Sequence, residues 1–461
     1  MREVLDKYVA KYRPEFMDLR VFRRLSFSVM IQDGKADRIL SRELWGACAR
    51  ALIDGAWGFS AINGTSREDF ERILSEAARM AKASSKRLTE RGVITKIEPV
   101  VDDVELPVKM RPEDIAIEDK VNELLKIEEE MRKYDPRIVN TVLSYNDSID
   151  EEIVVNSLGT EVRQRITRTR IGAFVVTREA EVLQRASEVE AGTQGYEVVK
   201  RFIEENMHLK ACERAVKLLS AEKPPAGKFT VVLDPSVVGL LVHEAFGHNS
   251  EADHVLSGES ILSDKLGKEV ASPLVTIIDD STVEGAYGSY KYDSEGTPGR
   301  KRVIVENGVL KGFLHSLETA AKLNMEPNGS ARADTHLWRP IVRMSNTYIA
   351  PGDWKFDEMI EDIKEGIYCK ASRWGYVFTE KGQFTCNVDE SYMIRNGEIR
   401  EMLRNVSFGG LTLETLKRVD AVGRDFVLAD KGICGKGGQG MFVGGGGPHI
   451  RIREVVVGGR R

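Results

Sequence analysis

The chain of 461 residues is long enough for two or three domains, and its 42% hydrophobic and 30% charged residues are ordinary for a globular protein. Its net charge of −5, without a single block of basic residues, argues against a nucleic-acid partner, which would require an electropositive face. No apolar run approaches the roughly 20 residues that span a bilayer, and the charged N-terminus lacks the apolar region of a signal peptide, so we expect a cytoplasmic protein with no membrane partner.

The first half of the chain mixes helical and strand-like patterns. The Asp33-Gly34 pair tolerates positive φ and predicts a hairpin turn between two apolar runs. Around Leu158-Gly159, apolar and polar residues alternate as they do in half-exposed antiparallel strands. Other stretches carry apolar residues at helical spacing. We expect hairpins over residues 19–44 and 151–177, and helices over residues 67–86, 120–133 and 196–220.

A domain border is predicted at residues 223–227, where two prolines and a glycine end the preceding helix just before an apolar strand at residues 229–233. We expect an N-terminal mixed α/β domain over residues 1–222. A C-terminal domain of largely antiparallel sheet then covers residues 228–461. Asn-Gly pairs at 307–308 and 396–397 predict hairpins within it, and residues 356–364 predict a short helix. The predicted fold class is α+β.

One segment of the C-terminal half carries a motif with chemical meaning. Asp234 can cap a helix and Pro235 suits its first position, so His243 and Glu244 should lie near the end of a helix of about three turns. With His248 the motif is HExxxH, one residue longer than the HExxH pattern of zinc peptidases.

The longer spacing has a structural consequence. Five residues at about 100° each place His248 roughly 140° from His243 on a regular helix, where the two could not share a metal. Gly247 offers a solution, because glycine readily takes the left-handed conformation that ends a helix. We therefore expect the helix to break at or just before Gly247, which lets His248 turn back toward His243.

Two neutral imidazoles suit zinc, and a catalytic zinc usually has three protein ligands. Glu244, next to the first histidine but pointing elsewhere on the helix, fits a general base for the attacking water. The alternative is that the histidines are ordinary core or surface residues, because chance HExxxH patterns occur in unrelated proteins. The acidic and imidazole groups of Glu251, Asp253 and His254 favour a metal site, although a solvated loop would look the same.

The third ligand cannot be identified from spacing. The five cysteines are odd in number and scattered, which predicts reduced thiols rather than disulfides. Cys434 lies among glycines beside Lys436, a setting that favours a thiolate. A flexible glycine loop with an incidental cysteine is the competing interpretation, and the residues alone slightly favour it. The candidates that stay open are Glu251, His254, Cys369, Cys386 and Cys434.

The ordered set of motifs resembles the TldD/PmbA family over nearly the whole chain. HEAFGH at residues 243–248 is similar to the HExxxH signature of TldD proteins. The C-terminal loop departs from the family pattern at the glycine run 444–447 and at His449. The other matching segments are residues 55–58, 296–300, 304–312, 343–349, 434–439 and 455–459.

The resemblance implies an intracellular zinc metallopeptidase that works as a complex of two related subunits. Because this chain keeps HExxxH, it resembles the metal-bearing TldD-like subunit, and its partner would be a TldE/PmbA-like paralogue in a heterodimer, or a second copy in a homodimer. Carried over residue by residue, the resemblance assigns one zinc per chain to His243, His248 and Cys434, and the role of general base to Glu244. This assignment replaces the incidental interpretation of Cys434.

The implied function is that of a zinc-dependent endo- or exopeptidase acting on short or unfolded polypeptides, which the sheet-rich domain could bind as an added strand. Two alternatives remain open. The first is a non-catalytic regulatory or binding subunit with a structural zinc, because the family has also been described as a modulator of DNA gyrase. The second is a zinc hydrolase that acts on a non-peptide amide or ester.

Overall fold

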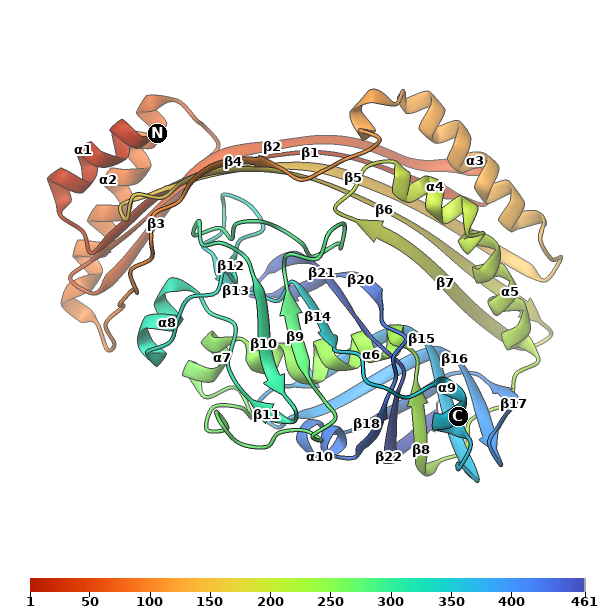
Figure 1. Ribbon diagram of the computed structural model, residues 1–461. Helices are drawn as coiled ribbons and strands as arrows, with labels where there is room; N and C mark the ends of the chain where they lie inside the picture. The colour runs from red at the N-terminus through yellow and green to blue at the C-terminus, as the bar shows by residue number, and fades with distance from the viewer. Residues whose placement is uncertain (460–461) are drawn as a thin grey trace.

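The computed structural model describes residues 1–459 as a mixed α/β protein in which a long curved sheet arches over a second body. Figure 1 shows the helices of the first part at the two ends of this sheet and the C-terminal part beneath its concave face. The sheet has the order β3-β2-β1-β5-β6-β4, with β7 also paired to β6. Its strands are β1 (Phe16–Gln32), β2 (Lys35–Ile53), β3 (Ala56–Ile62), β4 (Val101–Glu105), β5 (Ile138–Asn156), β6 (Glu161–Glu179) and β7 (Val182–Gly192).

The two ends of the sheet carry separate apolar clusters, each formed under amphipathic helices. One end is covered by α1 and α2, the other by α3, α4 and α5. The central strands therefore need another cover, which the C-terminal part supplies (Figure 1). The helices are α1 (Arg2–Tyr12), α2 (Arg67–Ser84), α3 (Ile117–Lys133), α4 (Glu197–Glu204) and α5 (Met207–Leu219).

The predicted helix over residues 196–220 is wrong as a single element. It is divided into α4 and α5 at Asn206, which has a left-handed φ of 52°. Asparagine tolerates this conformation better than most residues, and the break lets two short apolar faces pack at different angles on β6 and β7. The predicted hairpins at Asp33-Gly34 and over residues 151–177 are confirmed, and so are the helices over 67–86 and 120–133.

The C-terminal part contains two larger sheets and is largely antiparallel, as expected. One has the order β11-β10-β9-β14-β21-β20; in the other, β15, β8, β22, β18 and β16 close into a ring because β15 also pairs with β16. The strands are β8 (Gly227–Leu233), β9 (Ile277–Asp280), β10 (Lys301–Glu306), β11 (Val309–Leu310), β12 (Ala331–Arg332), β13 (Ile341–Val342), β14 (Asn346–Ile349), β15 (Glu365–Phe378), β16 (Gln383–Arg395), β17 (Glu398–Leu403), β18 (Val406–Leu411), β19 (Val419–Val422), β20 (Val427–Lys436), β21 (Gln439–Gly447) and β22 (Ile450–Gly459).

Short helices connect these strands. One of them, α6, lies in the main apolar core of the C-terminal part. It packs between β20–β21 of the sheet that starts with β11 and β15–β16 of the closed ring of strands. The hairpins predicted at residues 307–308 and 396–397 are confirmed, whereas the predicted helix over 356–364 is shorter. The helices are α6 (Pro235–Leu241), α7 (Ala252–Ser257), α8 (Leu317–Leu323), α9 (Phe356–Ile360) and α10 (Thr412–Lys417).

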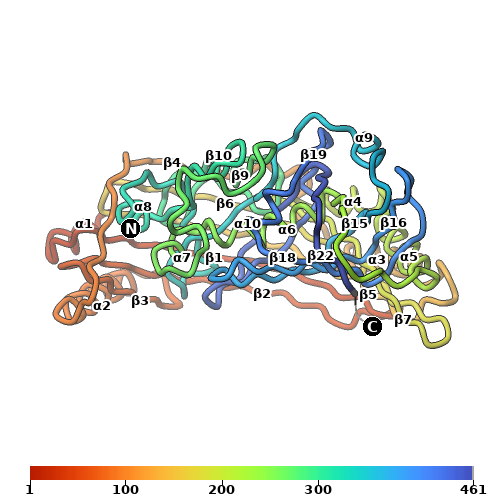
Figure 2. Tube along the Cα trace, turned by 90° about the horizontal axis from the view of Figure 1, so that it is seen from below, coloured from red at the N-terminus to blue at the C-terminus, as the bar shows by residue number. Residues whose placement is uncertain are grey.

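Side chains on the concave face of the first sheet hold the C-terminal part in place. Buried Arg20 of β1 donates hydrogen bonds to the carbonyl oxygens of Thr335 (2.9 Å) and Trp338 (2.6 Å). Arg50 of β2 forms an ion pair with Glu295 at 2.9 Å. In the view from below, the C-terminal segments lie along much of the length of β1 and β2 (Figure 2). The predicted domain border at residues 223–227 falls between α5 and β8, and it remains a prediction.

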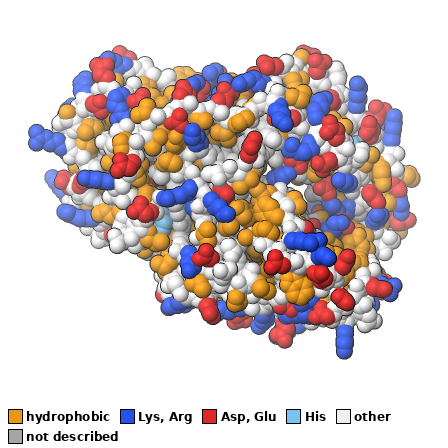
Figure 3. Space-filling model, viewed as in Figure 1, with side chains coloured by type: hydrophobic (Ala, Val, Ile, Leu, Met, Phe, Trp, Pro, Cys, Tyr) orange, Lys and Arg blue, Asp and Glu red, His pale blue; other side chains and the backbone are white. Residues whose placement is uncertain are grey.

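The surface agrees with the dispersed charge of the sequence. Figure 3 shows acidic and basic side chains intermixed over the visible face, with apolar side chains gathered near its middle. Among residues 1–459, no helix combines the length and the apolar character needed to cross a bilayer.

Candidate metal centre

The HExxxH residues, 243–248, follow helix α6, which begins directly after β8. As predicted, Asp234 caps α6, because its carboxylate accepts a hydrogen bond from the backbone amide of Val237 (2.9 Å), and Pro235 occupies the first helical position. The helix does not stop at its last α-helical residue. It continues as a π-helical turn, η3 (Val242–Gly247), which contains the first histidine and the glutamate of the motif.

The expected break at Gly247 is wrong. Gly247 has right-handed angles (φ −56°, ψ −52°), and the amide of His248 donates to the carbonyl oxygen of His243, five residues earlier. A π turn forms i→i+5 hydrogen bonds, so it brings residues five apart, the spacing of HExxxH, closer to one side of the helix than a regular α-helix does. The two imidazole rings consequently lie edge to face, with centroids 5.1 Å apart and an interplanar angle of 82°.

Gly247 is needed for space rather than for a positive φ. A Cβ atom built on it would lie 2.0 Å from the sulfur of Met344, which is itself buried. The short connection between β13 and β14 therefore packs directly against the π turn, and only a glycine permits this approach.

Cys434 joins the two histidines, although the residues alone favoured an incidental cysteine. It lies on β20, an edge strand, and its Sγ is 3.4 Å from Nε2 of His248. One ligand atom from each of His243, His248 and Cys434 lies within 4.8 Å of the others. Cys369 and Cys386 lie instead in the apolar core, where burial raises the pKa of the Cys369 thiol to about 12.

Glu251 supports His248 instead of joining the cluster. It is fully buried, and its Oε2 lies 3.0 Å from Nδ1 of His248 and 3.2 Å from Nζ of Lys436. Burial alone would raise the pKa of this carboxyl, but Lys436 and His248 hold it well below its usual range. An ionised carboxylate at Nδ1 fixes the ring and leaves Nε2 directed toward Cys434, as carboxylates that bind the outer nitrogen of metal-binding histidines do.

Buried Arg343 fixes the other side of the cluster. Its Nη2 donates to the carbonyl oxygen of Cys434 (2.6 Å) and its Nη1 to that of Gln439 (3.2 Å), so it holds both strands of the β20–β21 hairpin. Lys436 continues this network to Asp253 at 2.7 Å. The glycine-rich loop around Cys434 is therefore anchored on two sides.

The charges of the cluster favour a thiolate. Burial opposes ionisation of Cys434, but the imidazoles of His243 and His248 outweigh it and lower the pKa of the thiol to about 4. Burial likewise opposes protonation of His248, whereas Glu251 and Cys434 raise its pKa to about 10. A thiolate beside two imidazoles is a donor set that suits zinc, so the residues present fit the metal that the motif predicts.

Three family models match successive parts of the chain: PmbA/TldA metallopeptidase domain 1 over residues 17–81, the central domain over 111–219 and the C-terminal domain over 226–459. The chain belongs to the PmbA/TldD family. A metalloprotease of Methanocaldococcus jannaschii is 41% identical over 96% of this chain and 97% of its own length. A Saccharolobus solfataricus protein named zinc metalloprotease TldD homolog is 30% identical, over 98% of this chain and 99% of its own length.

Solved structures share the PmbA/TldD fold. A Thermotoga maritima protein, described as a candidate modulator of a DNA gyrase, superposes with a TM-score of 0.80 at 23% identity, over 99% of each chain. TldE from Thermococcus kodakarensis superposes with a TM-score of 0.79 at 19% identity, again over 99% of each chain. At these identities the likeness concerns the fold alone.

In this member of the PmbA/TldD family, Glu244 points toward β15, in the closed ring of strands of the C-terminal part. A Cβ built on Gly375 of β15 would lie 2.9 Å from Cγ of Glu244, so the glycine leaves room for the carboxylate. Sequence analysis missed the neighbouring Asp430 of β20, a carboxyl whose pKa is raised by burial and by the charge of Glu244, against the effect of His243. Its spacing of four residues from Cys434 places both on one face of a strand and could have identified it.

Proposed function

We propose that this chain is a zinc-dependent peptidase in which His243, His248 and Cys434 hold the metal and Glu244 is the general base. The observation that carries the proposal is the convergence of two imidazoles and one thiol within 4.8 Å, where a π turn that also bears a glutamate meets strand β20. Three protein ligands leave a position open, which is the arrangement of catalytic rather than structural zinc.

Each residue of the centre then has a defined task. Bound zinc would supply Lewis-acid chemistry, polarising a scissile carbonyl and lowering the pKa of water. Glu244 takes a proton from the attacking water on its carboxylate and afterwards delivers it to the nitrogen of the leaving amine. Glu251 keeps Nδ1 of His248 protonated, and Arg343 holds the backbone of Cys434, so both are positioning residues.

Two open strand edges support a peptide substrate. Among the described strands, β20 pairs with β21 alone, and residues 372–378 of β15 pair with β16 alone. Cys434 lies on the first edge, while Glu244 packs against Gly375 on the second. An extended polypeptide added to either edge would bind through its backbone, which suits short or unfolded chains and gives weak sequence preference.

For the quaternary structure, we propose a partner of the same family, either a TldE-like paralogue or a second copy of this chain. The support is the fold shared with TldE from Thermococcus kodakarensis over 99% of both chains. Enclosure of the metal centre between two such subunits would exclude folded proteins from it.

The decisive experiment combines metal analysis with peptide hydrolysis. Wild type should contain about one zinc per chain by mass spectrometry and should cleave an unfolded protein such as reduced casein. Cys434→Ala should lose the zinc, whereas Cys386→Ala, a control that removes a buried thiol of the apolar core, should keep it. Glu244→Ala should keep zinc and lose hydrolysis.

Absence of zinc, or unchanged hydrolysis by Glu244→Ala, would contradict the proposed mechanism. Bound zinc without any hydrolysis, even after a TldE-like partner is added, would favour the regulatory alternative. Cleavage of amide or ester substrates but not of peptides would identify the non-peptide hydrolase.

A further inference from the structure

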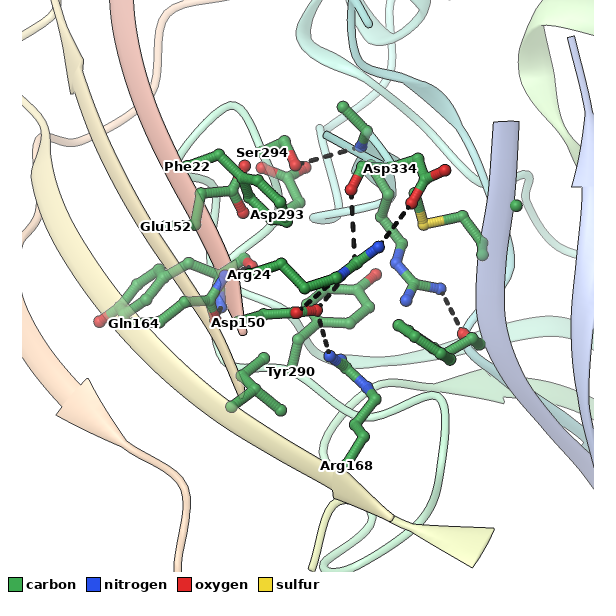
Figure 4. Close-up of a pocket in the computed structure, with 17 residues that line it drawn as sticks. Phe22, Arg24, Asp150, Glu152, Gln164, Arg168, Tyr290, Asp293, Ser294 and Asp334 are labelled. Atoms are coloured by element: carbon green, nitrogen blue, oxygen red, sulfur yellow. Dashed lines mark hydrogen bonds and ion pairs between the residues drawn. The ribbon is translucent and has the colours of Figure 1, made fainter. Parts of the chain in front are cut away.

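A small charged cavity lies between the concave face of the first sheet and the loops of the C-terminal part (Figure 4). Its volume of about 50 Å³ is several times the roughly 10–15 Å³ that one water needs, and it suits a group the size of a carboxylate. It shares Arg24, Arg168 and Phe442 with a larger cavity of about 530 Å³ that reaches Ile433 of β20.

Two of its arginines already have acidic partners. Figure 4 shows Arg24 between Asp150 and Asp334, with Arg168 directed at the same Asp150. Arg24 donates to both oxygens of Asp150 (2.6 and 2.9 Å) and to Asp334 (3.0 Å), and Arg168 lies 3.2 Å from Asp150. One carboxylate thus serves two guanidinium groups.

Arg332, the third arginine, has no such partner. It is only 6% exposed, and its Nη1 donates to the carbonyl oxygens of Met344 (2.7 Å) and Phe442 (2.9 Å). Within residues 1–459 it forms no ion pair, and its Nε and Nη2 make no hydrogen bond. Its guanidinium lies 4.8 Å from the ring centroid of Tyr290. A buried charge without a counter-ion is costly, and here it lines a cavity that an anion can enter.

The cavity adjoins the metal centre through β20 and β21. Phe442, whose carbonyl binds Arg332, is the cross-strand partner of Ile433, and Ile433 directly precedes Cys434. Alternate residues of a strand face opposite sides, so Cys434 faces the imidazoles while Ile433, 63% exposed, faces the larger cavity. A peptide lying along the β20 edge would likewise send alternate side chains toward the metal and toward this larger cavity, which shares Arg24, Arg168 and Phe442 with the smaller one.

We propose that this cavity is a carboxylate-binding subsite, in which Arg332 receives an acidic side chain of a peptide that enters through the larger cavity. The peptide as ligand follows from the proposed function, whereas the anion preference follows from the unpaired charge of Arg332. The two remaining carboxyls of the lining do not neutralise it, because Glu152 pairs with Arg20 at 3.0 Å, and burial and Glu295 raise the pKa of Asp293 to about 8. Planar guanidinium groups bind carboxylates through paired, charge-assisted hydrogen bonds, and Arg332 has donors free for them.

The test measures binding separately from catalysis. Zinc-loaded, full-length Glu244→Gln, which should leave peptides uncut, is titrated calorimetrically with two end-blocked seven-residue alanine peptides whose central residue is glutamate or glutamine. We expect the glutamate peptide to bind at least tenfold more tightly. Adding Arg332→Gln should bring the ratio close to one, and Arg332→Lys should give an intermediate ratio. Arg163→Gln, which removes an equal charge from a half-exposed position of β6 outside both cavities, should leave it unchanged.

Equal binding of the two peptides to Glu244→Gln would overturn the subsite. This comparison needs no substitution in the cavity, so it stays valid even if an Arg332 variant misfolds. Inorganic phosphate, titrated as a third probe, distinguishes a free-anion site: phosphate binding without preference between the peptides also overturns the proposal. If wild type cleaves peptides but the glutamate peptide binds no more tightly than the glutamine peptide, the carboxylate subsite is refuted and the proposed peptidase function is not. If the glutamate peptide binds more tightly but wild type cleaves no peptide, the peptidase function is refuted and the subsite is not.

Discussion

Replacement of Glu251 by glutamine tests whether the metal centre depends on the carboxylate behind His248. The change keeps the size of the side chain but removes the charge that His248, Lys436 and Arg343 share, at 3.0, 3.2 and 3.9 Å. Groups that hydrogen-bond the outer nitrogen of a metal-binding histidine typically contribute 10- to 100-fold in metal affinity. We expect Glu251→Gln to weaken zinc binding by this factor.

The stability of the variant should fall as well. Breaking a fully buried ion pair costs about 3–5 kcal/mol, and we expect the lower end because Lys436 keeps Asp253 at 2.7 Å. Zinc affinity is measured by competition with a chromogenic chelator, and stability by denaturant unfolding. Asp253→Asn is the matched control: its side chain is 32% exposed and does not contact His248, so zinc affinity should change less than twofold. Equal affinities of Glu251→Gln and wild type would refute the positioning role of Glu251.

Three further substitutions test local features of the fold. Gly247→Ala places a methyl group against Met344 and should cost about 1–3 kcal/mol with partial loss of zinc, whereas Gly432→Ala, in open space, should keep full zinc occupancy by mass spectrometry. Asn206→Ala should destabilise by about 1 kcal/mol in thermal unfolding because φ is positive there, while Asn206→Gly should not; equal melting of the two variants would contradict the helix break. Burial raises the pKa of Asp389 to about 7, so the folded chain retains a proton that the unfolded chain releases from about pH 4, and stability falls as pH rises through this window. Asp389→Asn should remove that loss, and its stability relative to wild type should rise by about 4 kcal/mol between pH 4 and pH 8 in denaturant unfolding; a pH-independent difference would refute the shift.

The elements that the sequence predicted well are those whose signals are local. Asp33-Gly34 and the Asn-Gly pairs define turns by backbone chemistry alone, and the helix over 67–86 has a clear apolar stripe. The break at Asn206 was missed because asparagine is compatible with a helix interior, and only packing against the sheet decides where the chain bends.

The candidate site could be predicted only in part for the same reason. The spacing correctly indicated that a regular helix cannot bring His243 and His248 together. It predicted a helix break at the glycine, however, where the structure has a π turn. The reason Gly247 is required, its contact with Met344, joins segments almost a hundred residues apart in the chain and leaves no local trace. Cys434 was identified through family resemblance rather than spacing, because the fold alone brings β20 to the π turn.

The separation of the proposed ligands along the chain has a mechanical consequence. His248 and Cys434 are 186 positions apart, so a metal held between them would tie the π turn to an edge strand that pairs on one side only. The same strand reaches the first sheet, where Lys431 forms an ion pair with Glu190 of β7 at 2.6 Å. Because binding energy at such a site is also folding energy, metal binding would hold β20 against both the π turn and the concave sheet. The metal would thereby also shape the larger cavity, which Ile433 of this strand lines.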